Sequence, residues 1–211
     1  MQIYWFDELD STQTYLKDKL KSGVLKSPVC IVADKQTEGV GSRGNSWIGL
    51  DGNLFFSFAI DRNELPKDLA LESSSIYFSY ILKEVFSELG SKVWLKWPND
   101  FYINENKIGG TITYLRENDI LCGIGINLVD APDDFASLDI EIDKKELLNK
   151  FFKKFEKKFS WKHIFSKYEV EFSQSKKHSM HLKNNKISLE NANLNEDGSL
   201  NVNGQRIYSL R

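Results

Sequence analysis

The residues best suited to chemistry lie between 94 and 110, where a cation, an Asn-Asp pair and two adjacent glycines occur together. Asn99 and Asp100 follow a strand-like segment that ends at a proline, because proline has no N–H to donate to a central strand. Lys107 begins the next strand, and Gly110 leaves bare backbone that a ligand can approach closely. An ammonium, polar side chains and open backbone on two neighbouring strands predict a pocket for an anion or a nucleotide. The alternative is a surface hairpin with a solvated lysine.

A glycine-rich segment at 36–52 is the second candidate for ligand binding. Its backbone N–H groups, together with the guanidinium of Arg43, can surround a phosphate. No helix pattern follows the G-x-G-x-x-G run from Gly39 to Gly44, so this run does not predict a dinucleotide-binding fold. Nine of the 13 glycines fall in this segment and in 109–125, and two glycine-lined walls indicate one cleft.

Hydrophobic periodicity predicts the elements that must position these residues. Ser11 or Thr12 caps a first helix, and the spacing of apolar residues predicts further helices over 66–90 and 144–172. The segment 128–143 has six acidic residues and no basic one, and we expect a mobile loop that orders over bound nucleotide. The predicted strands cover 28–35, 53–60, 93–97, 101–103, 107–115 and 120–127.

Composition limits the class of protein. A chain of 211 residues and 24.4 kDa suits one domain with a small appendage. The net charge of −2 argues against a protein that coats nucleic acid. No apolar run is long enough to cross a bilayer, and the first residues lack the basic start of a signal peptide. These features predict a cytoplasmic protein, in which Cys30 and Cys122 are buried reduced thiols.

The order of the motifs resembles that of the biotin protein ligases. The motifs are Ser11-Thr12-Gln13, then Q-x-x-G-x-G-x-x-G-x-x-W from Gln36 to Trp47, Lys96-Trp97-Pro98-Asn99-Asp100, Lys107-x-x-Gly110, and G-x-G-x-N ending at Asn127. The loop departs from the usual G-R-G-R-x-G-x-x-W of that family, because Val40 and Ser42 stand where arginines are usual. Arg43 lies one place later, and we expect it to carry the phosphate contact.

The resemblance implies an α+β fold of the class II synthetase-like, biotin–lipoate ligase type. Its mixed, mainly antiparallel sheet would be flanked by helices. Residues 1–175 would form the catalytic domain that binds biotin and ATP, and 176–211 a reduced SH3-like β subdomain. Because the last 25 residues cannot hold a core alone, we expect them to pack onto the main domain.

The resemblance also implies a reaction in two steps. Biotin attacks MgATP to give biotinoyl-5'-AMP, and a lysine of a biotin carboxyl carrier protein domain then takes the biotin. Mg²⁺ would enter with the phosphates, without a metal site built from protein side chains. The expected catalytic residues are Lys107, Arg43 and Asp100. The biotin-binding set is Ser11, Thr12, Gln13, Gln36, Gly39, Val40, Gly41, Ser42, Lys107 and Gly110, and the ATP-binding set is Arg43, Gly44, Trp47, Asn99, Lys107 and Asn127.

The physical roles of several side chains follow from this reaction. The ammonium of Lys107 can neutralise the carboxylate and the α-phosphate as charge shifts between them. Trp47 and Trp97 offer apolar surface to biotin, although Trp97 is equally suited to the core. Asp100 can orient the incoming lysine or a metal-bound water, or can simply cap the strand.

Other interpretations stay open at this point. A lipoate or octanoate ligase or transferase would share the fold, and a purely apolar pocket around Gln36 would favour it. A non-catalytic biotin or nucleotide sensor would explain the missing loop arginines. Because the motifs begin at Ser11, we expect the short type that has no helix-turn-helix domain and does not bind DNA. Both a monomer and a homodimer are compatible with the sequence.

Overall fold

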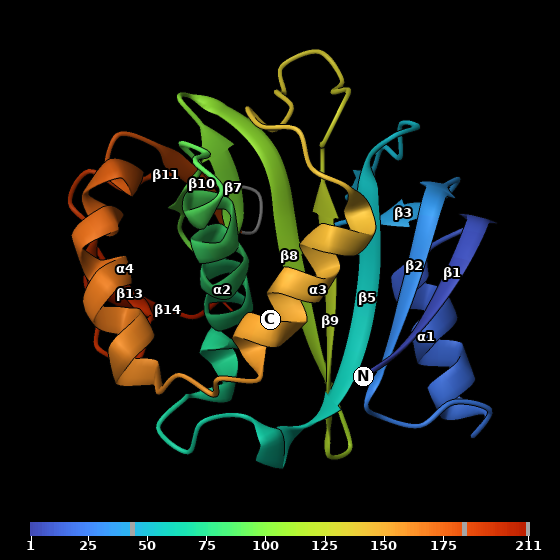
Figure 1. Cartoon of the computed structure of the whole chain (residues 1–211). Helices are drawn as coiled ribbons and strands as arrows, with labels where there is room; N and C mark the ends of the chain where they lie inside the picture. Colours follow the sequence, from blue (N-terminus) through green and yellow to red (C-terminus); the bar gives the residue numbers. More distant parts are fainter. Residues whose placement is uncertain (43–44, 183–184, 210–211) are drawn as a thin grey trace.

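The computed structural model describes residues 1–42, 45–182 and 185–209, and its core is a seven-stranded sheet (Figure 1). The strand order is β1-β2-β5-β9-β8-β7-β6. The β1 and β2 strands pair in parallel and all other neighbours are antiparallel, so the prediction of a mixed, mainly antiparallel α+β sheet is confirmed. The strands are β1 (Gln2–Leu9), β2 (Val29–Gln36), β5 (Leu54–Asp61), β6 (Trp94–Lys96), β7 (Asp100–Ile103), β8 (Asn106–Arg116) and β9 (Asp119–Ile126).

One face of the sheet is covered by α1 (Thr12–Lys21), which connects β1 to β2. Its buried apolar residues Leu16 and Leu20 lie four positions apart and pack against Ile31 and Leu121 of the sheet. Ser11 caps this helix, because its side chain accepts a hydrogen bond from Thr14 N at 3.3 Å. The cap therefore fixes the start of α1 over the sheet.

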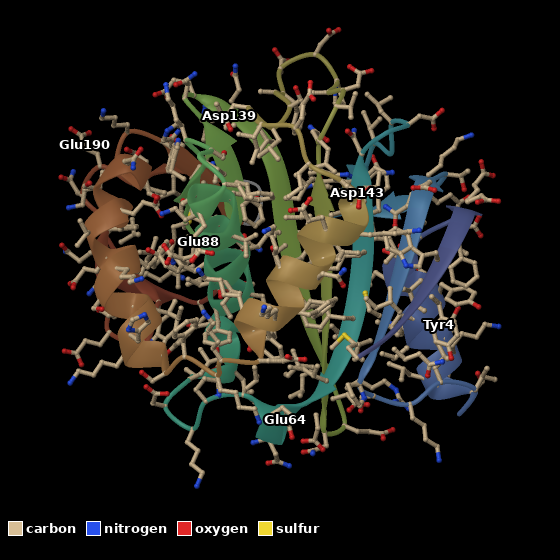
Figure 2. All side chains as sticks on the ribbon, viewed as in Figure 1. Tyr4, Glu64, Glu88, Asp139, Asp143 and Glu190 are labelled. Atoms are coloured by element: carbon tan, nitrogen blue, oxygen red, sulfur yellow. The ribbon has the colours of Figure 1, made fainter. Side chains whose placement is uncertain are left out.

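The opposite face carries α2 (Ser74–Glu88) and α3 (Lys144–Phe155), which lie in front of the sheet in Figure 1, with α1 behind it. Alternate residues of β5 point to this face, and an aromatic cluster fills the space beneath the helices. Within it the rings of Phe58 and Phe78 meet edge to face at 5.0 Å, and those of Phe56 and Phe151 at 5.7 Å. Asp143, labelled in Figure 2, caps α3 by accepting from two backbone amides of its first turn. The main core of the protein lies on this side.

Two predicted helices have different bounds in the structure. The helix expected over 66–90 begins only at Ser74, because Asp68 lies in a turn, where its carboxylate accepts hydrogen bonds from the backbone amides of Trp161 and Lys162. The helix expected over 144–172 is two helices, α3 and α4 (Trp161–Ser175). The break occurs where Lys158 has a φ of 49° and Ser160 begins the new helix as its N-cap.

The last part of the chain forms small sheets that pack onto the main core. Met180, Leu189, Leu200 and Ile207 are buried in the same cluster as α2 and α4. The SH3-like assignment and the boundary between 1–175 and 176–211 stay predictions. The strands are β10 (Ser179–Leu182), β11 (Asn185–Ser188), β12 (Asn193–Leu194), β13 (Leu200–Val202) and β14 (Gln205–Ile207).

Three further features complete the fold. A small hairpin of β3 (Gly39–Val40) and β4 (Ser46–Trp47) lies within the glycine-rich segment, and short 3-10 turns occupy Arg62–Glu64 and Leu71–Ser73. Both cysteines are free and buried, and burial raises the pKa of each thiol. Within the described residues, none of the helices combines the length and apolar character needed to cross a membrane.

Candidate active site

A cavity of about 440 Å³ lies on the face of the sheet that carries α1. Gly39 is not in its lining; it pairs with Trp47 in the β3–β4 hairpin, and a Cβ there would lie 2.4 Å from the Trp47 carbonyl oxygen. The predicted Arg43 and Gly44 contacts lie outside the described residues. The structure brings the other predicted site residues together around this cavity: Ser11, Thr12, Gln13, Gln36, Val40, Gly41, Ser42, Trp47, Asn99, Asp100, Lys107, Gly110 and Asn127.

Glycines on one face of the sheet make room for the cavity. Gly123 and Gly125 of β9 lie two residues apart, so both leave the same face bare. A Cβ on Gly123 would lie 2.7 Å from Gln13 Oε1, and one on Gly125 would lie 2.8 Å from Trp47 Cε2. The neighbouring strand continues the gap, because Gly110 pairs with Gly125. The floor of the cavity is therefore backbone.

A cluster of uncharged polar side chains lines the part of the cavity near Gly123. Gln36 Oε1 accepts from Thr12 N at 2.8 Å and from Thr12 Oγ1 at 3.0 Å, and Thr12 Oγ1 lies 2.9 Å from Ser57 Oγ. These side chains are buried, and their mutual hydrogen bonds hold them in place. Gln13 Oε1 is buried beside them without a hydrogen-bond partner. This part of the cavity suits a neutral, hydrogen-bonding ligand group.

The charged side chains of the cavity lie two residues further along β9, beside Gly125. Lys107 Nζ lies 2.6 Å from Asp100 Oδ1, and each side chain is about a quarter exposed, at 27% and 25%. The same ammonium lies 5.6 Å from the centroid of the Trp47 ring. A Cβ on Gly110 would be 3.3 Å from Asp100 Oδ1, so the glycine leaves space below the pair. Among the described lining residues, Lys107 and Asp100 are the only charged ones.

Two asparagines line the cavity on either side of the ion pair, Asn99 at the level of Thr111 and Asn127 just after the end of β9. Asn99 Nδ2 donates to the carbonyl of Thr111, and this bond fixes the side chain on β8. Asn127 Nδ2 donates to Ala136 O at 3.2 Å, whereas Asn127 Oδ1 is buried without a partner. Trp47 Nε1 is also buried and unpartnered. Buried polar atoms are rarely left unpaired, so these atoms point to ligand groups that complete their hydrogen bonds.

The predicted nucleotide loop at 128–143 has no regular secondary structure and is anchored at both ends. Asn53 is fully buried, and its Oδ1 accepts from the amides of residues 128–130, with Leu128 N at 2.9 Å. Near the other end, Asp139 accepts from Ser91 Oγ and from Lys92 N. Between these anchors the loop brings Phe135 to the cavity. Its ordering over nucleotide stays a prediction.

Sequence reasoning missed several lining residues. Ser57 was detectable, because it is the only polar residue between Leu54 and Ile60 of an apolar strand. Trp97 is fully buried, lies outside the lining of this cavity and donates its indole N–H to Gly198 O, so the core interpretation of this residue holds. Gly123 and Gly125 were expected in a glycine-lined wall and do line the cavity. The other missed lining residues are Asn45, Ser46, Ile48, Thr111, Ile112, Ile124, Pro132 and Phe135.

Comparisons with known proteins agree with the geometry. Residues 5–128 match the model of the biotin/lipoate A/B protein ligase family. The structure of the biotin acetyl coenzyme A carboxylase synthetase from Helicobacter pylori with bound biotinylated ATP superposes with a TM-score of 0.95 and 42% identity, covering 98% of this chain and 99% of that one. The biotin protein ligase from Aquifex aeolicus in complex with biotin and ATP gives a TM-score of 0.77 and 26% identity over 100% and 96%.

A curated relative, the bifunctional ligase/repressor BirA of Escherichia coli, is 35% identical over 127 residues. That match covers 57% of this chain and 38% of the relative. The chain thus spans about two fifths of the length of the bacterial ligase/repressors that it matches.

Proposed function

The chain belongs to the biotin/lipoate A/B protein ligase family, and from this premise we propose that it is a biotin protein ligase. It activates biotin with MgATP to biotinoyl-5'-AMP and pyrophosphate, and it then transfers biotin to a lysine of a biotin carboxyl carrier protein domain. The observation that carries the proposal is the order of groups along β9. The uncharged polar side chains lie beside Gly123, and the Lys107–Asp100 ion pair and the Trp47 indole lie beside Gly125. The buried side-chain amide of Asn127 follows the strand. Biotinoyl-5'-AMP has its groups in the same order: a neutral ring, an acyl phosphate and a nucleoside.

The neutral ureido ring of biotin fits the polar end. Gln13 Oε1 lacks a partner there and can accept an N–H, while Thr12 and Ser57 hydroxyls can turn toward a carbonyl oxygen. Ser11 holds the start of α1 at the same place through its cap. The valeryl chain then lies over the bare backbone of the glycines, where a Cβ would collide with it. A ring without polar edges would leave these groups unpaired, which disfavours lipoate.

Lys107 supports the first chemical step. Two anions, a carboxylate and an α-phosphate, have to approach each other, and their repulsion opposes the reaction. The ammonium beside Gly125 lowers this repulsion and stabilises the negative charge that builds on the phosphate oxygens as the carboxylate oxygen forms its bond to phosphorus. Pyrophosphate leaves with the electron pair of the broken P–O bond. Arg43 is proposed to add a second cation to this phosphate.

The adenosine is placed against Trp47 and the two asparagines. Indole rings stack on bases, and Asn127 Oδ1 can accept from the exocyclic amine of adenine. Asp100 is the single carboxylate among the described lining residues, and it is already paired with Lys107. Such a site suits a Mg²⁺ that keeps most of its water and binds chiefly through the phosphates of ATP.

In the second step the ε-amine of the carrier lysine attacks the acyl carbon, and AMP leaves. Asp100 can accept the proton that this amine loses.

We assign the protein to the cytoplasm, as a monomer or homodimer, with a protein domain rather than DNA as its partner. The net charge of −2 supports this choice of partner.

ATP–pyrophosphate exchange tests the proposal. Purified protein is incubated with MgATP and labelled pyrophosphate, with biotin, with lipoate or with neither. Exchange that depends strictly on biotin is the expected result. Exchange with lipoate alone would move the protein to the lipoate branch of the family. Binding of biotin without exchange would leave a non-catalytic sensor and contradict the proposal.

A further inference from the structure

One turn of the C-terminal sheet is hydrogen-bonded to three separate segments of the chain. The turn 196–198 lies between β12 and β13, and each of its three successive carbonyl oxygens accepts from a side chain. Each of the three donors lies at least 35 residues from its acceptor in the sequence. The donors in order are Trp161 Nε1 at 2.7 Å, Ser73 Oγ, and Trp97 Nε1 at 2.9 Å.

The turn itself is fixed. Gly198 has a φ of 82°, and a Cβ there would lie 2.7 Å from Ser73 Oγ and 3.0 Å from Trp161 Cζ2, so only glycine fits. The carboxylate of Asp197 accepts from Ser199 N at 3.1 Å and pairs with the Arg206 guanidinium at 2.7 Å. The Gly198 carbonyl oxygen is therefore a stationary acceptor for the indole of Trp97.

Trp97 is held a second time through its backbone. Its N–H donates to Ser175 Oγ at 3.0 Å, and Ser175 is the fully buried last residue of α4. Two residues further on, Asn99 O accepts from Thr111 N at 3.1 Å, and Asp100 pairs with Lys107 in the cavity. The chain between Trp97 and Asp100 thus runs from a double anchor in the core directly into the site.

We infer that Trp97 is a positioning residue for the proposed reaction: anchored by the Gly198 carbonyl and Ser175, it sets the placement of Asn99 and Asp100 against Lys107. The inference rests on the proposed function and extends it, because it assigns the two acceptors of Trp97, the Gly198 carbonyl and Ser175 Oγ, a part in placing the site residues. A misplacement of about 1 Å at a reacting group is enough to cost roughly a hundredfold in rate.

A matched pair of substitutions isolates this role. Trp97→Phe and Trp161→Phe each remove one indole N–H that donates to a carbonyl of the same turn, and both tryptophans are buried. We expect similar losses of thermal stability. Only Trp97→Phe should lower kcat for the biotin-dependent transfer to a carrier domain, by roughly ten- to a hundredfold, with a smaller change in KM for biotin. Ser175→Ala should resemble Trp97→Phe, with Ser173→Ala as its control, because Ser173 is exposed and its Oγ donates within α4 to Val170 O.

Hydrogen exchange provides a readout that does not depend on turnover. The amide of Thr111 reports on the anchored segment, since it donates to Asn99 O. Trp97→Phe should lower the protection of peptides covering 97–112 more than Trp161→Phe does. Equal kinetics and equal protection in the two variants would overturn the inference. If the wild-type protein showed no ATP–pyrophosphate exchange with biotin, the proposed function would fail. The hydrogen-exchange protection would still decide whether Trp97 positions this segment.

Discussion

The ammonium of Lys107 and the carboxylate of Asp100 are 2.6 Å apart, in a cavity where no other described lining residue is charged. The two side chains come from neighbouring strands, β7 and β8, whose register places Asp100 opposite Gly110. In the absence of substrate they neutralise each other. An incoming carboxylate and phosphate therefore meet a cation that a fixed anion already holds in place, which is the preorganisation that electrostatic catalysis requires.

Removal of the cation should abolish the first step. We expect Lys107→Ala to lower kcat/KM for biotin-dependent pyrophosphate exchange by at least roughly a hundredfold, because the repulsion between the two substrate anions is no longer offset. Lys35→Ala is the control, since Lys35 also forms an ion pair, with Glu8 at 2.9 Å, on the exposed end of β2. Equal activity of the two variants would rule out a catalytic role for Lys107.

Asp100 should matter more for the second step than for the first. In Asp100→Asn the amide keeps the shape of the side chain but cannot take a proton from the attacking lysine. We expect transfer of biotin to a carrier domain to fall by roughly a hundredfold, and pyrophosphate exchange to fall much less. Both rates are measured on the same preparation. A parallel loss of the two would mean that Asp100 serves only to hold Lys107.

The two glycines of β9 should divide the cavity into a biotin end and a nucleotide end. A methyl group on Gly123 would collide with Gln13, and one on Gly125 would collide with the Trp47 indole. Overpacking of this kind costs about 1–3 kcal/mol. We expect Gly123→Ala to weaken biotin binding more than ATP binding, and Gly125→Ala to do the reverse, as measured by calorimetry. Each variant is the control for the other, and identical profiles would contradict the proposed order of groups along β9.

Much of this site could be predicted because its signals are local. The G-I-G alternation in β9 needs only the two-residue period of a strand to place both glycines on one face. The cap at Ser11 and the hairpin from Asp100 to Gly110 likewise depend on neighbours in the chain. The single serine in the apolar strand β5 was a signal of the same kind that was overlooked.

The remaining features depend on contacts between distant parts of the chain. The helix predicted from residue 66 begins only at Ser74, because Asp68 lies in a turn and its carboxylate accepts from the amide of Trp161, 93 residues later, at the start of α4. The indole of Trp97 meets the carbonyl of Gly198 across 101 residues. Neither residue type nor spacing indicates such a partner. The parallel pairing of β1 with β2 is equally non-local, and periodicity carries no information on strand order.

Glu171 of α4 should make stability depend on pH. Burial raises the pKa of Glu171, and the ammonium of Lys83, whose Nζ lies 3.2 Å from Glu171 Oε1, offsets only part of this rise. The other carboxylate oxygen, Oε2, is buried without a hydrogen-bond partner. At pH values between the unfolded and the folded pKa, the folded protein therefore binds more protons at this group than the unfolded chain does. The stability that this group contributes is fully present below its unfolded pKa and is lost as pH rises through its folded pKa.

Glu171→Gln removes the ionisation while it keeps the size of the side chain. We expect the free energy of unfolding of the variant to rise relative to wild type as the pH increases above about 4.3, the ordinary pKa of a glutamate. Urea denaturation at a series of pH values between 4 and 8 measures this difference. Glu169→Gln is the control, because Glu169 is exposed on the same helix. A difference for Glu171→Gln that stays constant across the series would show that the buried carboxyl does not titrate there, and that Lys83 keeps it ionised throughout.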